Sequence, residues 1–260
     1  TSSGEVTGTG IIMTADGYII TNCHVIEDGD TPQVLLQNDD SYQAAVIGSD
    51  ETSDLAVLKI DADGLTPAEF GDSDALQVGD AVVAIGDPLG TQLRGTMTDG
   101  IISAINRDLA FDGRTMTLLQ TNAALNSGNS GGPLLNNRGQ VVGVNSAKMR
   151  TELGYENMGF AIPISDAQTI INDLVKYGYV KGRVMLGITG ENITQTGYEG
   201  FMIRSIDSDS VLNGTNAQVG DIITEIDGVR VKSQTELRSE LAKHEVGDQI
   251  TLTLLRIDSR

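Results

Sequence analysis

Residues 126–135 read NSGNSGGPLL, and this stretch places Ser130 among three glycines. Glycine has no Cβ, so another chain could lie close against the backbone here. The backbone amides of the residues around Ser130 could point at one spot beside its hydroxyl, an arrangement that stabilises an oxyanion during acyl transfer. A surface turn of small polar residues would explain the same letters. The stretch alone therefore leaves a nucleophile loop and an ordinary turn open.

A catalytic serine needs a base that takes its proton, so the histidines of the chain come next. The chain has two. His244 lies in LAKHEVG at the end of a predicted helix, where a histidine interacts with the helix dipole and with solvent, and we interpret it as structural. His24 lies in IITNCHVI, at the end of an apolar strand that follows the hairpin signal Asp16-Gly17. His24 is therefore the candidate base.

A carboxylate must orient that base, and Asp54 is the best candidate. It stands at the head of the apolar run in SDLAVLKI, where a buried charge would be costly without a hydrogen-bonded partner. Asp50, Asp61 and Asp63 have more polar surroundings. A turn residue that enters a strand would also explain Asp54, so the choice depends on the order of the three candidates along the chain.

The order His24, Asp54, Ser130, in the segments TNCHVI, SDLAVL and GNSGGPL, resembles that of the chymotrypsin-like serine proteases. Within them, the chain is most similar to the HtrA/Deg family of envelope quality-control proteases. This similarity also includes GTGIIMTADGYIITN, VVAIGDPLG, GIISAINR, QTNAALNSGNSGGPLLN, GVNSA and MGFAIP. The resemblance implies a serine endopeptidase without metal or organic cofactor, in which His24 is the general base, Asp54 orients it and Ser130 attacks the scissile carbonyl.

The resemblance also implies where substrate binds. Ala124 stands six positions before the nucleophile, at the bottom of the pocket for the side chain that precedes the cleaved bond. With Leu125 beside it and no carboxylate, we expect small or medium aliphatic side chains rather than Lys or Arg. Ser146 matches the residue that hydrogen-bonds the catalytic Asp, and Ser146 and Ala147 open the strand that pairs with substrate. The oxyanion hole is expected at Gly128, Asn129 and Ser130.

The loop before the nucleophile departs from the family at two positions, because Asn122 replaces the usual Asp and Ser127 the usual Pro. Without the proline ring, the φ angle at position 127 is not fixed. The segment then has more conformations to lose before its amides can form an oxyanion hole, so we expect the resting enzyme to populate an inactive loop.

Two further residues match regulatory positions of related proteases. Arg107, at the end of GIISAINR, matches a sensor-loop arginine, and Asp87, within GDPLG at 86–90, lies in the matching activation loop. The alternative is that residues 106–116 form an ordinary exposed loop with Arg107 solvated.

The segments GRVMLGI, YEGFMIRSI, VGDIITEIDGVRV and SQTELRSELAKH resemble a PDZ domain. We expect an extended peptide to bind between the helix of the last segment and the strand Phe201 to Arg204, adding a strand to the sheet edge. The residues expected to bind the peptide carboxylate and its apolar last side chain are Glu199, Gly200, Phe201, Met202, Leu237 and Leu241.

These patterns predict a mostly β protein, a chymotrypsin-like double six-stranded β-barrel followed by a small α+β PDZ domain. Short strands between Gly and Asp turns run from Thr9 to about Ala161. A capping box at Ser165 and Gln168 then starts a helix that Gly178 ends. The expected domains are a protease domain at 1–178, a linker at 179–183 and a PDZ domain at 184–260, with the first strand of the former and the last strand of the latter clipped.

Composition argues against several classes of binding partner and of structural element. The net charge of −19 argues against binding to nucleic acid or to an anionic membrane surface. The single cysteine, Cys23, excludes an intramolecular disulfide and is interpreted as a small buried residue rather than a redox group. The sequence shows neither a signal peptide nor a stretch that could span a bilayer.

The family resemblance implies an ATP-independent endopeptidase that degrades or processes unfolded or misfolded envelope or secreted proteins. It implies a homotrimer or higher trimer-based oligomer in an extracytoplasmic location, with C-terminal peptides bound at the PDZ domain. The alternative is a chaperone or peptide-binding module with latent protease activity. The presence of all three catalytic residue types favours the endopeptidase.

Overall fold

The computed structural model describes residues 7–27, 31–88, 93–111, 114–147, 158–195, 198–208 and 210–256. The chain divides into two compact units, which adjoin in sequence between Val180 and Lys181. Each has its own hydrophobic core.

The first unit begins with a five-stranded antiparallel sheet in the order β1-β2-β5-β4-β3. The turn between its first two strands needs a glycine, because Gly17 has a φ of 102° and a Cβ there would lie 2.4 Å from the carbonyl oxygen of Ile60. A single helical turn, α1 (Cys23–Ile26), follows β2. The strands are β1 (Ile11–Ile12), β2 (Tyr18–Thr21), β3 (Gln33–Leu35), β4 (Ser41–Asp50) and β5 (Leu55–Ile60).

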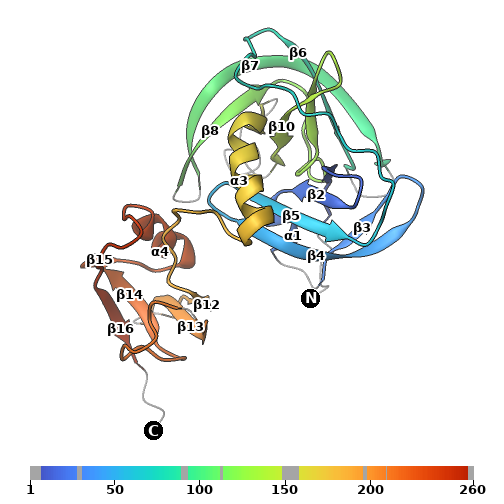
Figure 1. Ribbon diagram of the computed structural model, residues 1–260. Coiled ribbons are helices and arrows are strands. Elements are labelled where there is room, and N and C mark those ends of the chain that lie inside the picture. Colours follow the sequence, from blue (N-terminus) through green and yellow to red (C-terminus); the bar gives the residue numbers. More distant parts are fainter. Residues whose placement is uncertain are drawn as a thin grey trace. The chain divides into compact units, whose positions relative to one another are not determined.

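The rest of this unit is a closed six-stranded barrel in the order β10-β11-β8-β7-β6-β9 (Figure 1). Side chains from its strands form an apolar cluster that includes Ile102, Leu119 and Leu134. The strands are β6 (Ala81–Gly86), β7 (Thr96–Phe111), β8 (Arg114–Thr121), β9 (Pro133–Asn136), β10 (Val141–Asn145) and β11 (Gly159–Pro163).

The predicted fold class is confirmed, with one difference in the first half. The sequence predicts two closed six-stranded barrels, whereas the first sheet has five described strands and remains open. Its end strands, β1 and β3, are two and three residues long and do not pair with each other in the described part of the chain. Short end strands offer few backbone groups for a closing seam.

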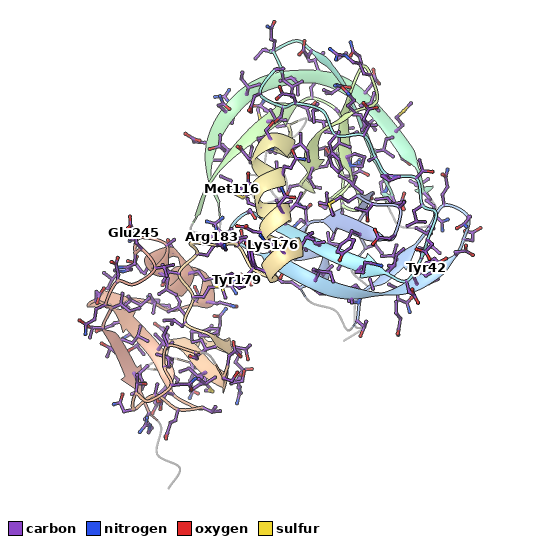
Figure 2. The ribbon with its side chains drawn as sticks, viewed as in Figure 1. Tyr42, Met116, Lys176, Tyr179, Arg183 and Glu245 are labelled. Atoms are coloured by element: carbon purple, nitrogen blue, oxygen red, sulfur yellow. The ribbon has the colours of Figure 1, made fainter. Side chains whose placement is uncertain are left out.

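Helix α3 (Ile164–Tyr177) packs against β4 and β5 of the open sheet and against β10 and β11 of the barrel (Figure 1). It therefore ties the two halves of the unit together. It ends as predicted at Gly178, whose φ is 80° and whose amide donates to the carbonyl of Leu174 at 2.9 Å. Lys176 lies in the last helical turn (Figure 2). Its Nζ atom is 5.0 Å from the ring centroid of Tyr177.

The predicted capping box at the start of α3 is wrong. The N-cap is Pro163, which makes no side-chain capping bond, and the first-turn amide of Ser165 donates instead to the hydroxyl of Ser73 at 3.1 Å. Ser165 instead lies inside the first turn, where its hydroxyl accepts a hydrogen bond from the Ser73 hydroxyl at 2.9 Å and one from the Ser73 amide at 3.2 Å. A partner 92 residues away therefore replaces the local one that the sequence pattern suggested.

The second unit is a five-stranded sheet in the order β12-β13-β14-β15, with β16 also paired to β14, and one helix. The predicted capping box of that helix is present: Ser233 accepts a hydrogen bond from the Glu236 amide at 3.2 Å, and Glu236 accepts one from the Lys232 amide at 2.8 Å. The elements are β12 (Ile188–Ile193), β13 (Gly200–Ile206), β14 (Ile222–Ile226), β15 (Val229–Arg230), α4 (Gln234–Leu241) and β16 (Leu252–Leu255).

The prediction that a peptide adds a strand at Phe201 to Arg204 is wrong for this sheet. Strand β13 is already paired on both sides, since Phe201 lies opposite Asn192 of β12 and Ile223 of β14. Its backbone therefore has no open side along Phe201 to Ile203. Among the described strands, β12 pairs only with β13 and lies at one edge of the sheet, and β15 and β16 pair only with β14 and lie at the other.

Candidate active site

His24 and Asp54 form the closest charged contact of the site. The Nδ1 atom of His24 lies 2.8 Å from Oδ2 and 2.9 Å from Oδ1 of Asp54, and the His24 backbone amide donates to Oδ1 at 3.1 Å. When Nδ1 carries the proton of the neutral ring, Nε2 is left as an acceptor. The predicted base and carboxylate are therefore brought together, in the arrangement that prepares a histidine to take a proton.

The backbone of Asp54 also makes hydrogen bonds at the site. Its φ of 55° lies in the left-handed region, which Asp tolerates better than most residues. The Asp54 carbonyl accepts hydrogen bonds from the side chain of Asn22 at 2.9 Å and from the amide of Cys23 at 3.2 Å. One residue thus fixes the three residues Asn22, Cys23 and His24, which explains why the helix α1 starts there.

Ser146, at the end of β10, completes the environment of the carboxylate. Its hydroxyl donates to Oδ2 of Asp54 at 3.2 Å, and both residues are buried. The closed barrel therefore supplies a donor to a carboxylate that belongs to the open sheet. This contact agrees with the position that the sequence predicts for Ser146.

The nucleophile loop, residues 126–132, connects β8 to β9 and is built on a tight turn. The Asn129 amide donates to the carbonyl of Asn126 at 3.0 Å, and Gly128 has a φ of 100°. Because Ser127 is not among the residues with positive φ, this is a type II turn with Ser127 second and Gly128 third. A Cβ on Gly128 would lie 2.3 Å from the carbonyl oxygen of Asp87, so no other residue fits.

Two amides around the nucleophile have no partner within the described part of the chain. Among the described residues, the backbone N–H groups of Gly128 and Ser130 donate no hydrogen bond, whereas that of Asn129 is used within the turn. A pair of unpartnered amides beside a serine is what stabilisation of an oxyanion requires. The predicted three-residue oxyanion hole therefore has two available donors in this conformation.

The Ser130 side chain is 4% exposed, and its hydroxyl oxygen accepts a hydrogen bond from the Ala147 amide at 3.0 Å. Within the described part of the chain, no hydrogen bond joins Ser130 to the ring of His24. Catalytic hydrogen bonds are often long or misaligned in ligand-free enzymes and shorten when substrate binds. The nucleophile and the base are thus present at the site but not yet engaged.

The predicted pocket residues have different environments. Ala124 is exposed, and its carbonyl accepts a hydrogen bond from the Thr98 hydroxyl at 2.9 Å. Leu125 is only 1% exposed and packs in the core of the barrel, while Ala147 is 4% exposed beside the nucleophile. Asn122, one of the departures from the family, accepts a hydrogen bond from the Ile101 amide at 2.8 Å. Their role in specificity stays a prediction.

The two predicted regulatory residues have separate partners. Arg107, on β7, donates from Nε to the side chain of Gln120 on β8 at 3.2 Å. Asp87 follows β6, and its carboxylate accepts a hydrogen bond from the Gly95 amide at 2.8 Å. Parts of both predicted loops, residues 89–92 and 112–113, lie outside the described residues.

Sequence reasoning missed two residues of the site. Asn22 is fully buried and binds the Asp54 carbonyl, and Thr9 contacts the nucleophile loop directly. The signal for each was a polar residue in an unusual position: Asn22 immediately follows an apolar strand, and Thr9 stands between two glycines.

Comparisons with known proteins agree with this geometry. A trypsin-like peptidase domain matches residues 8–144, and a PDZ domain matches residues 184–260. The serine protease Do-like HtrA of Lactobacillus helveticus is 42% identical over 272 residues, covering 96% of this chain and 65% of the relative. The serine protease Do-like HtrB of Bacillus subtilis is 39% identical, covering 95% of this chain and 59% of the relative. The chain thus spans about three fifths of the length of these relatives.

Solved structures show the same likeness. An HtrA-type protease, AlgW, with a decapeptide has a TM-score of 0.64 at 33% identity and covers 96% of this chain and 78% of that one. The serine endoprotease from Yersinia pestis has a TM-score of 0.61 at 36% identity and covers 98% and 86%. The chain therefore belongs to the HtrA family of serine proteases, with a trypsin-like peptidase domain followed by a PDZ domain.

Proposed function

We propose that this protein is an ATP-independent serine endopeptidase that degrades or processes unfolded or misfolded proteins. The observation that carries the proposal is the contact of the His24 ring with the buried Asp54 carboxylate at 2.8 Å, next to a serine flanked by two unpartnered amides. None of these features alone requires catalysis. Together they supply a base, its orienting group, a nucleophile and two donors for an oxyanion.

The proposed reaction begins when the Ser130 hydroxyl turns from the Ala147 amide to Nε2 of His24. His24 then takes the hydroxyl proton while the oxygen attacks the scissile carbonyl. The amides of Gly128 and Ser130 stabilise the negative oxygen of the tetrahedral intermediate. His24 returns the proton to the leaving amine, and water repeats the sequence to release the acyl group. Asp54 stays ionised throughout and stabilises the imidazolium.

Digestion of β-casein tests this proposal. The parent protein should cleave it without added ATP, and Ser130→Ala should abolish cleavage. Ser49→Ala, an exposed serine on β4, is the matched control and should leave the rate unchanged. Cleavage by Ser130→Ala at the parent rate would show that this serine is not the nucleophile. Absence of cleavage by the parent would favour the alternative, a chaperone or peptide-binding module with latent catalysis.

We also propose that the second unit binds the C-termini of peptides, at the open edge of β12 rather than at β13. Strand addition needs unpaired backbone groups, and β12 is an outer strand of the sheet. The start of α4 lies beside it, because the Gln234 amide donates to the side chain of Asn192 at 2.6 Å. An extended peptide placed there would have a helix along its other side.

Calorimetry with a free-acid peptide and its C-terminal amide tests the carboxylate requirement, and equal affinity would contradict it. Amide chemical shifts then locate the peptide. Changes along β12 and α4 are expected. Chemical-shift changes confined to Glu199, Gly200 and Met202 would instead support the binding site that the sequence predicts.

The location and assembly of the protein are proposals as well. An extracytoplasmic location in the cell envelope is supported by relatives that are named periplasmic, including one from Haemophilus influenzae that is 36% identical. Among the described residues, no helix is long and apolar enough to cross a membrane. A homotrimer or higher trimer-based oligomer rests on the family resemblance alone. Light scattering on the eluting protein would decide the assembly, and a monomeric mass would contradict it.

A further inference from the structure

Thr9 contacts three segments that are far apart in the sequence. Its amide donates to the carbonyl of Ser130 at 2.8 Å, and its own carbonyl accepts from the hydroxyl of Thr21 at 2.8 Å. Its hydroxyl donates to the carbonyl of Gly128 at 2.6 Å and accepts from the amide of Asp87 at 3.1 Å. Every polar group of this residue is therefore used, on β2, on the nucleophile loop and on the segment after β6.

These contacts decide which peptide planes of the nucleophile loop can rotate. The plane between Gly128 and Asn129 is bonded at both ends, by the Thr9 hydroxyl and by the carbonyl of Asn126. The plane between Ser130 and Gly131 is also bonded at both ends, by the Thr9 amide and the carbonyl of Asn145 at 2.9 Å. Thr9 thus supplies one bond to each of the two fixed planes.

The two unpartnered amides belong to the planes in between. The plane of the Ser130 amide is restrained because its carbonyl end, on Asn129, accepts from the Gly132 amide at 3.0 Å. The plane between Ser127 and Gly128 has no such bond at either end within the described residues. The direction of the Gly128 amide is therefore restrained mainly through its neighbour, the plane that the Thr9 hydroxyl binds.

The backbone around Thr9 leaves little space for an alternative. A Cβ on Gly8 would lie 2.5 Å from Cγ1 of Val25, and one on Gly10 would lie 2.6 Å from Cγ2 of Ile19. A Cβ on Gly132 would lie 3.0 Å from the Thr9 methyl group. The Thr9 side chain is thus closely surrounded, and its hydroxyl has a fixed place between Asp87 and Gly128.

We propose that Thr9 is a positioning residue of the oxyanion hole, which couples the position of Asp87 to the orientation of the Gly128 amide. A hydroxyl has one hydrogen, so its donation to the Gly128 carbonyl leaves a lone pair for the Asp87 amide. A shift of either segment changes the bond to the other. The proposal deepens the endopeptidase function and rests on it for its catalytic consequence.

Three variants test the proposal by kinetics on a chromogenic peptide. Thr9→Val keeps the shape and removes both hydroxyl bonds, whereas Thr9→Ser keeps the hydroxyl. The matched control is Thr14→Val, which loses a hydroxyl that accepts from the Tyr18 amide at 3.1 Å in the β1–β2 turn. Loss of an oxyanion donor costs about 10²–10³ in kcat, so its misplacement in Thr9→Val should cost about 10- to 100-fold with little change in KM. Thr9→Ser should recover most of this loss, and Thr14→Val should match the parent.

A second measurement does not depend on catalysis. Amide hydrogen exchange is followed in the Ser130→Ala background, with Thr9→Ala as a further variant if Thr9→Val does not fold. Exchange should accelerate at 84–88 and 126–132 in the Thr9→Val protein and stay unchanged with Thr9→Ser or Thr14→Val. Unchanged exchange in both segments, or parent kcat in an active Thr9→Val enzyme, would overturn the proposal. Because exchange reports on Thr9 directly, it gives its answer even if the casein experiment contradicts the endopeptidase function.

Discussion

The amide of Ala147 donates a hydrogen bond of 3.0 Å to the hydroxyl oxygen of Ser130. This amide belongs to the segment that we expect to pair with the substrate backbone. Substrate that pairs with this segment is therefore expected to approach the amide that binds the nucleophile. Among the described residues Ser130 makes no hydrogen bond to the His24 ring in this arrangement, and catalysis requires one.

Replacement of Asp54 by Asn should lower kcat by about 10⁴-fold, because an amide stabilises the wrong tautomer of the histidine ring. Asn also accepts left-handed backbone, so the variant should fold. Steady-state kinetics on a peptide substrate measure the effect, with His24→Ala expected to be at least as severe. Asp61→Asn, an exposed residue just after β5, is the control. A loss of less than tenfold in Asp54→Asn would remove Asp54 from the catalytic group.

Replacement of Ser127 by Pro should raise basal activity. Ser127 is the second residue of the type II turn, where the fixed φ of Pro is favoured. Pro at a compatible position stabilises by about 0.4–1 kcal/mol, which corresponds to roughly a two- to fivefold gain in the ordered loop. Ser127→Gly should have the opposite effect. Equal basal rates in the parent, Pro and Gly proteins would show that order at this turn does not limit activity.

The peptides that the enzyme releases from casein should end mainly in Val, Ala, Ile or Leu. Ala124 and Leu125 offer no carboxylate to compensate the desolvation of a basic side chain. Mass spectrometry of the digest identifies the cut sites, and digestion by Ser130→Ala supplies the background. A majority of cuts after Lys or Arg would contradict this specificity.

Replacement of Arg107 by Ala should lower turnover and reduce any stimulation by peptides, if this residue carries a signal to the nucleophile loop. The observed contact, with Gln120 at 3.2 Å, lies within one pair of strands. Gln120→Ala removes that local contact and keeps the arginine, so it separates the two roles. Parent rates and full stimulation in Arg107→Ala would identify an ordinary exposed arginine.

Acid should weaken the second unit through Asp221. Its side chain is buried, and hydrogen bonds from Arg256 at 2.6 and 2.7 Å lower the pKa of this carboxyl below its ordinary value of 3.8. A carboxyl with a lowered pKa in the folded state stabilises fully above 3.8, and this contribution disappears as the pH falls through the lowered value.

Arg256→Ala should therefore destabilise the protein at neutral pH, and its difference from the parent should shrink below pH 3.8. Hydrogen exchange of β14 and β16 in the full chain measures this. Arg204→Ala, whose partner Glu191 is exposed, should cost little at any pH. A constant difference between Arg256→Ala and the parent across this range would assign the loss to packing instead.

The sequence identifies the chemistry of the site better than its geometry. Catalysis needs particular residue types, and the order of His24, Asp54 and Ser130 along the chain is typical of one protease family and can be read from the sequence. The turn at Gly128 is also local, so its glycine and its neighbours predict it. The state of the Ser130 hydroxyl is not local, because its partner Ala147 is 17 residues away, beyond the end of β10.

The errors have the same physical origin. Ser165 and Gln168 form a capping pattern in the sequence. In the structure, however, the hydroxyl of the distant Ser73 donates a hydrogen bond to the hydroxyl of Ser165. The strand at Phe201 looks suited to receive a peptide, but long-range pairing places it inside the sheet. Thr9 escaped notice because its hydroxyl partner Gly128 lies 119 residues away. Local patterns predict local bonds, and tertiary partners replace them where they compete.

The left-handed backbone conformation of Asp54 also limits which substitutions the protein can accept at this position during evolution. Single-nucleotide changes convert an Asp codon to several others, but only those for Asn and Gly encode residues that readily accept a φ of 55°. Neither carries the charge that orients His24. A descendant that loses Asp54 and keeps the fold is therefore expected to carry Asn or Gly at this position.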